Sequence, residues 1–211
     1  MERRQHWEHV YGTKSPSEVS WYRPHLERSL VLIESCAMSK QAAILDIGGG
    51  ASTLVDDLLA AGFQDVSVLD IAQAAVDVTR RRLGSAGSTV HWLAEDFLDA
   101  KLEPQRYDIC HDRAVFHFLT DAGEKSRYFE QVERILRPGG SLILATFALE
   151  GPSRCSGLDV TRYGEEQMKE AAGAPFELVS SQRESHHTPA GSVQEMMYFV
   201  LRRSTPSPAG S

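Results

Sequence analysis

The chain has 211 residues, of which 42% are hydrophobic and 24% are charged, and its formal net charge is -7. This length is enough for one α/β domain with a full core. The acidic balance argues against a general nucleic-acid-binding protein, which would present a basic face. No apolar run approaches the ~18 residues of a membrane span, and the first residues lack the apolar core of a secretory signal. Three widely separated cysteines predict no disulfide framework, so we expect a cytoplasmic protein.

Residues 1–40 are expected to form an N-terminal segment, irregular and aromatic-rich over residues 1–25 and helical over residues 24–38. Short apolar runs then alternate with helical patterns over residues 41–203. The predicted strands are residues 43–47, 66–69, 90–93, 107–111, 141–147, 176–180 and 197–202. A helical pattern of apolar residues begins at Leu54 and ends at Gly62, and further helices are predicted at residues 71–83, 125–136 and 164–172. Residues 137–140 are predicted to form a turn. The alternation predicts a single domain with a doubly wound sheet, followed by a disordered tail at residues 204–211.

A glycine-rich turn follows the first predicted strand. Asp46 directly precedes Gly48, Gly49 and Gly50, and Asp70 ends the next predicted strand. The glycines let the backbone approach a ligand closely. A carboxylate at the end of the second predicted strand, such as that of Asp70, can accept hydrogen bonds from a ribose diol. The third glycine of G-x-G-x-x-G and the G-K-[ST] ending of a P-loop are both missing, which disfavours a nicotinamide cofactor and a triphosphate.

The stretch Ile44-Leu45-Asp46-Ile47-Gly48-Gly49-Gly50 resembles the first motif of class I methyltransferases that use S-adenosylmethionine (SAM). Glu95-Asp96-Phe97 is similar to the segment after the family's third strand, and Leu136-Arg137-Pro138-Gly139-Gly140 to the turn before its fifth. The resemblance covers roughly residues 41–147. It implies a Rossmann-like, seven-stranded, mostly parallel sheet, with SAM as methyl donor and S-adenosylhomocysteine (SAH) as product.

The resemblance also implies a role for each matching position. The amino end of the methionine moiety would lie near Asp46, partly through water, and the backbone of Gly48 and Gly50 would contact the same moiety. Asp70 would bind the ribose hydroxyls, with Ile71 beside it. Asp96 would accept from the adenine amino group, and Phe97 would line the adenine pocket. Alternatively, Asp70 could only cap the following helix and Asp96 could be a surface loop acid.

The fourth predicted strand continues into His111, Asp112 and Arg113, and His117 follows on the next element. The Asp-Arg pair resembles the thiopurine methyltransferase group and the Asp-Lys segment of some small protein-lysine methyltransferases. His111 or His117 could act as general base, with His111 also beside the cofactor. Asp112 could orient an amine or pair with Arg113, which could hold a substrate carboxylate. The alternatives are a structural Asp112–Arg113 ion pair and a packed core histidine at 117.

Two other segments are expected to reach this site. Trp21 and Tyr22 lie in a region similar to the leading segment of small methyltransferases that close over the cofactor, and they could cover the methionine side. Packing of these rings on the domain surface is the alternative. The loop at residues 150–158 is predicted to be a substrate lid. The adjacent His186 and His187 lack metal-ligand spacing, so no metal site is expected.

The leading hypothesis is a SAM-dependent methyltransferase that acts on a small-molecule acceptor by in-line transfer. A protein-lysine methyltransferase is the second, and it predicts an acidic, aromatic-lined channel near Trp21, Asp112 and Phe116. A non-catalytic SAM-binding protein is the third hypothesis, and a nicotinamide oxidoreductase is a remote fourth. We expect a monomer with no nucleic-acid or membrane partner.

Overall fold

The computed structural model describes residues 3–205. A seven-stranded sheet forms its centre, in the spatial order β3-β2-β1-β4-β5-β9-β8. In this sheet β9 runs opposite to the other six strands, so the predicted doubly wound, mostly parallel sheet is confirmed. The strands are β1 (Ala43–Ile47), β2 (Asp65–Asp70), β3 (His91–Ala94), β4 (Tyr107–Arg113), β5 (Leu136–Phe147), β8 (Phe176–His187) and β9 (Val193–Arg203).

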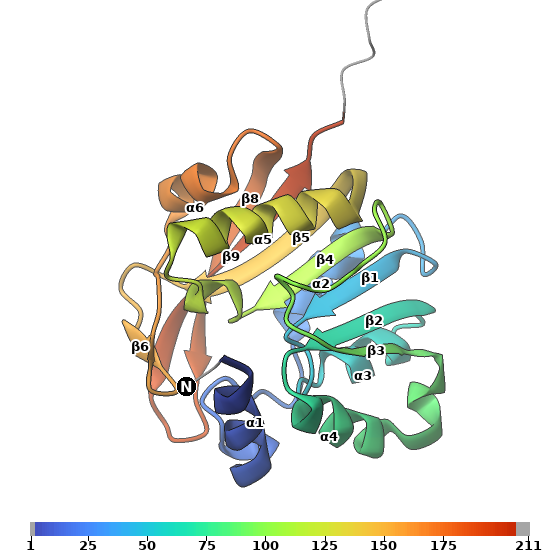
Figure 1. The fold of residues 1–211 in the computed structure, drawn as a ribbon, viewed down its shortest axis with the longest axis vertical. Coiled ribbons are helices and arrows are strands. Elements are labelled where there is room, and N and C mark those ends of the chain that lie inside the picture. Colours follow the sequence, from blue (N-terminus) through green and yellow to red (C-terminus); the bar gives the residue numbers. More distant parts are fainter. Residues whose placement is uncertain (1–2, 206–211) are drawn as a thin grey trace, which may run out of the picture.

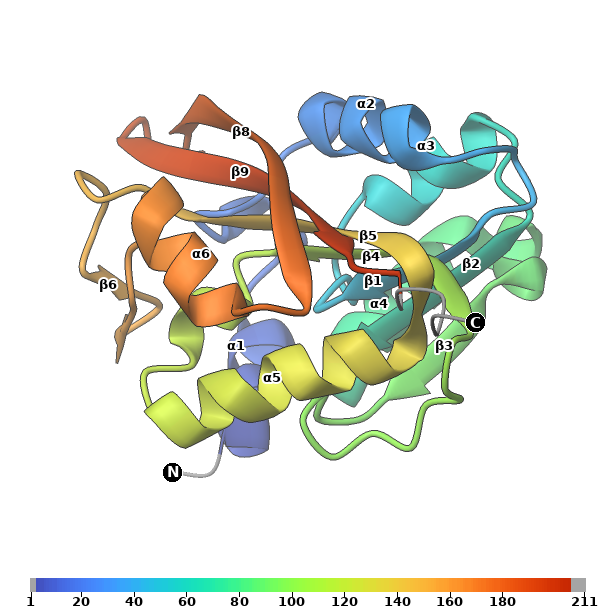
Figure 2. The same ribbon diagram turned by 90° about the horizontal axis from the view of Figure 1, so that it is seen from above.

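Helices cover both faces of this sheet (Figures 1 and 2). On one face, α2 (Glu27–Cys36) and α3 (Leu54–Ala60) bury an apolar cluster that includes Ile33 and Leu58. On the other face, α5 (Ala122–Ile135) and α6 (Glu165–Ala172) bury a second cluster that includes Tyr128 and Met168. The helix α4 (Gln73–Leu83) packs beside β2 and β3. Each strand of the centre is therefore buried on both faces, which explains the continuous apolar runs of β1 and β2.

Several local expectations were wrong. Residues 3–13, predicted to be irregular, form α1 (Arg3–Thr13), which has almost no amphipathic pattern because only Val10 is buried. The predicted loop after β5 contains a small hairpin of β6 (Arg154–Cys155) and β7 (Leu158–Asp159). The predicted turn at residues 137–140 is part of β5, with Gly139 at a φ of 77°. Within the predicted disordered tail, Ser204 donates its N–H to Pro175 at 2.9 Å, and residues 206–211 lie outside the described residues.

The glycine turn after β1 is fixed by two requirements. Gly48 has a φ of 72°, and the amides of Gly48 and Gly49 both donate to the Leu69 carbonyl, at 2.7 and 3.2 Å. A Cβ at Gly48 would overlap the Cγ2 atom of Val115. Left-handed backbone and close packing thus both demand glycine here. The turn holds the ends of β1 and β2 together at the edge where ligands bind in such sheets.

Replacement of Gly48 by alanine should destabilise the protein more than replacement of Gly62. Both positions have positive φ, but a Cβ at Gly62 meets no atom within 4 Å. Gly62→Ala should cost about 1–2 kcal/mol of backbone strain, and Gly48→Ala about 1–3 kcal/mol more because of the clash. Adding Val115→Ala to Gly48→Ala should recover part of the loss. Denaturant unfolding measures all of these variants, and equal losses at the two glycines would contradict the packing argument.

Candidate active site

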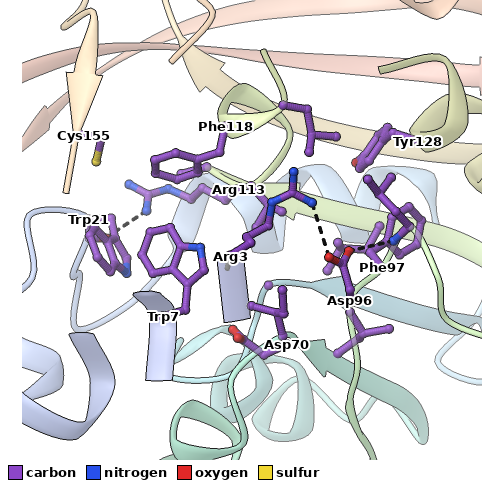
Figure 3. Close-up of a pocket in the computed structure, with 18 of the residues that line it drawn as sticks. Arg3, Trp7, Trp21, Asp70, Asp96, Phe97, Arg113, Phe118, Tyr128 and Cys155 are labelled. Atoms are coloured by element: carbon purple, nitrogen blue, oxygen red, sulfur yellow. Dashed lines mark hydrogen bonds and ion pairs between the residues drawn. The ribbon is translucent and has the colours of Figure 1, made fainter. Parts of the chain in front are cut away.

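A pocket lies at the carboxyl ends of the parallel strands, beneath α1 (Figure 3). Its floor is formed by the ends of β1, β2 and β4, and its roof by aromatic side chains from the N-terminal segment. Of the predicted site residues, it brings together Trp21, Gly48, Asp70, Ile71, Asp96, Phe97 and Arg113. It is not lined by Tyr22, Asp46, Gly50, His111, Asp112 or His117. Residues that the sequence did not single out complete the lining, among them Arg3, Val115, Phe118 and Tyr128.

Asp70 is the central acid of the pocket floor. One of its oxygens, Oδ1, accepts the amide of Ala72 at 2.8 Å, and Oδ2 accepts the amide of Gly50 at 3.1 Å. Burial raises the pKa of this carboxyl to about 6, against the lowering effect of the two backbone amides. Each oxygen still has a free lone pair for a hydroxyl donor. Asp70 thus binds the amide of Ala72, the residue just before α4, and also faces the pocket.

A second acid, Asp96, lies at the β3 end of the pocket. Its Oδ1 accepts the amide of Leu98 at 3.0 Å, and its Oδ2 accepts Nη1 of Arg3 at 3.3 Å. Arg3 also bridges to Glu124 of α5 at 2.6 Å, so α1 is tied to both sides of this end of the pocket. Phe97 is buried beside it and packs on Tyr128, with ring centroids 5.1 Å apart. Arg3 was missed at the sequence level because α1 was not predicted to be a helix.

The helix α1 is held over the pocket at a second point. Glu8 accepts the amides of Gln73 and Ala74 at the start of α4, at 2.7 and 3.2 Å. A carboxylate at this position satisfies amides that have no partner within the helix. The ring of Trp7 then reaches Trp21 and Phe118, with centroids 5.8 and 5.0 Å away. In the N-terminal segment, Trp7, Tyr11 and Trp21 therefore line the pocket, and Tyr22 does not.

His111 does not face the pocket, contrary to the prediction of a base. Its Nδ1 lies 2.7 Å from Oδ1 of Asp46, and its Nε2 lies 2.9 Å from the hydroxyl of Ser29. These distances match a hydrolytic Ser-His-Asp triad. However, Ser29, His111 and Asp46 are 0%, 1% and 2% exposed, so no substrate reaches the serine. The group is a buried network between α2, β4 and β1, and neither histidine nitrogen is free to take a proton from an acceptor.

Asp112 also has a structural position, and it does not pair with Arg113. Its carboxylate accepts the amide of Val115 at 2.9 Å, the amide of Phe116 at 3.1 Å and the hydroxyl of Tyr128 at 2.7 Å. Burial raises the pKa of this group to about 6. Asp112 therefore closes the turn between β4 and the short 3-10 helix at residues 116–118. An approaching amine would have to displace these donors, so the predicted orienting role is wrong in this geometry.

His117 is the packed core histidine of the alternative interpretation. It is fully buried, with its ring 4.7 Å from that of Phe147 and 4.5 Å from that of Phe118. Neither of its nitrogens has a hydrogen-bond partner in the described part of the chain. Burial first, and then the nearby charge of Arg113, lower its pKa to about 3. It is therefore a neutral ring at physiological pH and does not line the pocket.

Arg113 does reach the pocket, on the side opposite Asp96 (Figure 3). Its Nε donates to the hydroxyl of Tyr198 at 3.0 Å, and its Nη1 donates to the carbonyl of Trp21 at 2.9 Å. The remaining nitrogen, Nη2, is buried and has no partner. Cys155 lies on the same side, where burial raises the pKa of its thiol. The pocket is thus divided into a carboxylate-bearing part at β2 and β3 and a part at β4 whose charge is positive.

Comparisons with known proteins find methyltransferases. A family described as "Methyltransferase domain" matches residues 44–140. EEF1A lysine methyltransferase 2 of Danio rerio is 28% identical over 135 residues, 61% of this chain and 58% of that protein. The ubiquinone/menaquinone biosynthesis C-methyltransferase UbiE of Acidiphilium cryptum is 31% identical over 106 residues, 50% of this chain and 42% of that protein. The chain thus spans less than two thirds of the length of these relatives.

A solved structure has the same fold. The 1,6-didemethyltoxoflavin-N1-methyltransferase of Burkholderia thailandensis, determined with SAH bound, superposes with a TM-score of 0.72 over 95% of this chain and 87% of that one, at 19% identity. The chain has the fold of the class I SAM-dependent methyltransferases and resembles that superfamily in sequence over residues 44–140. Its predicted fold class and its resemblance to this superfamily are thereby confirmed.

The pocket has features that fit SAM, the cofactor of the class I methyltransferases. A Cβ at Gly49 would overlap the Asp46 carboxylate, and a Cβ at Gly50 would come within 2.7 Å of Asp70 and Ala75, so the turn leaves room only for bare backbone. Oδ2 of Asp46 is buried without a partner beside this turn. An unpaired buried carboxylate oxygen is costly and suits the cationic amine of SAM. Asp70 and Asp96 supply acceptors for ribose hydroxyls and an adenine amine, respectively.

Residues 3–205 contain no group of three or more histidine, cysteine, aspartate or glutamate side chains arranged to hold a metal ion. None of the helices in the described range is both long and apolar enough to cross a membrane.

The raised pKa of Asp70 predicts that SAH affinity increases with pH. Between its ordinary pKa and about 6, the carboxyl is largely protonated in the free protein. Hydroxyl donors favour the charged form, so binding releases a proton in this range. We expect SAH to bind roughly five- to tenfold more tightly at pH 7 than at pH 5, as measured by calorimetry in buffers of different ionisation enthalpy. Asp70→Asn should abolish this pH dependence, and an unchanged dependence would show that another group titrates.

Proposed function

We propose that this chain transfers the methyl group of SAM to a small-molecule acceptor that carries a carboxylate. The observation that carries the proposal is the charge of the pocket near β4. Among the described residues that line the pocket there, beside Trp21 and Cys155, Arg113 is the charged one. An acidic channel, which a lysine acceptor would favour, is missing from this part because Asp112 is buried in its turn. The proposed acceptor therefore complements a guanidinium.

In this proposal the cofactor occupies the part of the pocket at β1, β2 and β3. Asp70 binds the ribose hydroxyls, Asp96 and Phe97 bind the adenine, and Gly48 and Ile71 line the remainder. When bound, SAM supplies an electrophilic methyl group on a sulfonium. The methyl carbon would then lie toward β4, where Arg113, Ala114 and Val115 line the pocket.

Arg113 would hold the acceptor through its unused nitrogen. Two of its three nitrogens are engaged by Tyr198 and Trp21, which fix the plane of the guanidinium. The third is buried and unpaired. Hydrogen bonds between a guanidinium and a carboxylate are charge-assisted and about twice as strong as neutral ones. A carboxylate at this position would satisfy a donor that otherwise costs free energy.

The body of the acceptor should be apolar and flat. Trp7 packs edge to face against both Trp21 and Phe118 above this part of the pocket, and the ring centroid of Tyr11 lies 6.2 Å from that of Trp21. Aromatic rings in this arrangement favour offset or edge contacts with another ring. The rings also present negative faces that favour the sulfonium.

The acceptor must provide a nucleophile that needs little help from a base. His111 and Asp112 are engaged and buried, His117 is neutral and outside the pocket, and burial raises the pKa of Tyr11 and Cys155. A neutral amine, a ring nitrogen or a carboxylate oxygen already has a free lone pair. That pair forms the new bond to carbon while the bond to sulfur breaks and its electrons stay on SAH. An amine would lose its extra proton to solvent.

A protein lysine remains the second candidate. Relatives that match this chain at 22–28% identity are named EEF1A lysine methyltransferase 2 or eEF1A lysine and N-terminal methyltransferase. The net charge of -7 would attract a basic partner. The guanidinium of Arg113 would repel a lysine ammonium inside the pocket, which is why the acidic small molecule is preferred.

The cofactor assignment is tested by binding of SAH, with NAD as the control ligand. We expect calorimetry to show SAH binding and no NAD binding. Asp70→Ala should weaken SAH binding by about 1–3 kcal/mol, the cost of losing hydrogen bonds to a charged group. Asp77→Ala, which removes an acid of α4 outside this pocket, should leave the affinity unchanged. Equal binding of NAD, or an unaffected Asp70→Ala variant, would contradict the assignment.

The acceptor class is tested with benzoate and its neutral analogue benzamide as probes of the SAH-saturated protein. Benzoate should bind at least about tenfold more tightly, because only the acid forms charge-assisted hydrogen bonds with Arg113. Arg113→Met should remove this preference, and Arg113→Lys should keep part of it. Arg106→Met is the control, since Arg106 pairs with Asp65 away from the pocket.

Benzamide binding as tight as benzoate, or a preference that survives Arg113→Met, would contradict the acidic acceptor. Incubation with labelled SAM and a cell lysate then separates the two candidates. Label in small acidic molecules supports the proposal, and label in one protein band supports the lysine acceptor.

A further inference from the structure

We propose that His111 is a positioning residue, which holds the carboxylate of Asp46 in place for the amino group of SAM. This inference rests on the proposed function, because it requires SAM to bind at the glycine turn. It replaces the role of general base that the sequence suggested for His111. The evidence is the geometry of the Asp46–His111–Ser29 network and one unpaired oxygen within it.

The strand register brings Asp46 and His111 together. They are paired positions of the neighbouring strands β1 and β4, and their side chains project to the same face of the sheet. Nδ1 of His111 lies 2.7 Å from Oδ1 of Asp46, and both side chains are almost fully buried. Aspartate at this position therefore has one oxygen fixed by the histidine before any ligand binds.

The network also indicates which nitrogen of His111 carries the hydrogen that faces Asp46. An ionised carboxylate can only accept, so Nδ1 must carry the hydrogen and donate it to Asp46. Nε2 is then an acceptor, and the hydroxyl of Ser29 donates to it across 2.9 Å. Ser29 lies on α2, which covers this face of the sheet. The helix thus selects the tautomer in which the histidine can support Asp46.

The second oxygen of Asp46 is the group that this arrangement holds for a ligand. Oδ2 is buried and has no hydrogen-bond partner, and a Cβ added to Gly49 would overlap it. In the described residues, no lysine or arginine forms an ion pair with this carboxylate. A cationic amine at the glycine turn, in direct contact or through one water molecule, would supply the missing donors. Loss of the His111 hydrogen bond would let the carboxylate rotate away from that position.

The experiment compares two ligands that differ in the amino-acid moiety. SAH carries the amine, whereas 5′-methylthioadenosine keeps the adenosine and the thioether and lacks the amino acid. For the wild-type protein and each variant, calorimetry gives the ratio of the two affinities. His111→Leu should weaken SAH binding at least tenfold and change methylthioadenosine binding less than twofold. His111→Asn, whose amide can still donate to Asp46, should retain SAH affinity within about threefold.

Two further variants separate positioning from a general structural role. His117→Leu is the matched control, because it also replaces a buried histidine but one without partners, and it should leave the affinity ratio unchanged. Ser29→Ala keeps the contact between His111 and Asp46 and removes only the donor to Nε2. It should reduce the ratio less than His111→Leu does, and it provides the test if His111→Leu does not fold.

The outcomes decide between the alternatives. Selective loss of SAH affinity in His111→Leu, or in Ser29→Ala if the former is unfolded, supports the proposal. Equal loss of both ligands shows that His111 only maintains the fold, and an unchanged ratio shows that Asp46 needs no support; either result overturns it. If the wild-type protein binds neither SAH nor methylthioadenosine, the proposed function fails instead.

Discussion

The pocket depends on the hydrogen bonds by which Asp70 ties the glycine turn to the end of β2. Its carboxylate receives the amides of Gly50 and Ala72, so one side chain fixes both the turn after β1 and the start of α4. Burial of the carboxylate disfavours its charged form, as its raised pKa shows. The two backbone amides offset part of the desolvation free energy of this carboxylate, and hydrogen-bond donors of a ligand would offset the rest.

The charges of the pocket are distributed according to the strands that carry them. The ends of β2 and β3 bring the carboxylates of Asp70 and Asp96 to the pocket, with Asp46 of β1 buried beside the glycine turn. The end of β4 instead contributes Arg113. A cationic cofactor over the former and an anionic acceptor over the latter would place opposite charges in contact throughout the pocket. The helix α1 completes it, because Glu8 binds the start of α4. Coverage of this kind excludes water and strengthens each of these interactions.

Much of this arrangement could be predicted from the sequence. Periodicity and the spacing of Asp46, the glycines and Asp70 predicted the sheet, the turn and the position of the pocket. The helix α1 could not be predicted, because it buries only Val10 and is held by long-range contacts such as Arg3 with Asp96. The aromatic N-terminal segment was expected to reach the site, but the helix that carries Trp7 was not. Contacts between residues some 90 positions apart leave no periodic signal in either segment.

The roles of His111, Asp112 and Arg113 at the end of β4 were harder to predict from the sequence. The alternation of side chains along a strand explains part of the outcome. Side chains alternate along a strand, so His111 and Arg113 face one side of the sheet and Asp112 faces the other. Asp112 accordingly meets Tyr128 of α5, while His111 meets Ser29 of α2. Three adjacent polar residues therefore could not all serve one reacting atom, and only Arg113, at the strand's end, extends into the pocket. What alternation alone could not decide is whether His111 would be free or paired. That depended on the register of β4 against β1, which places it opposite Asp46 and makes it a support for the cofactor site rather than a base.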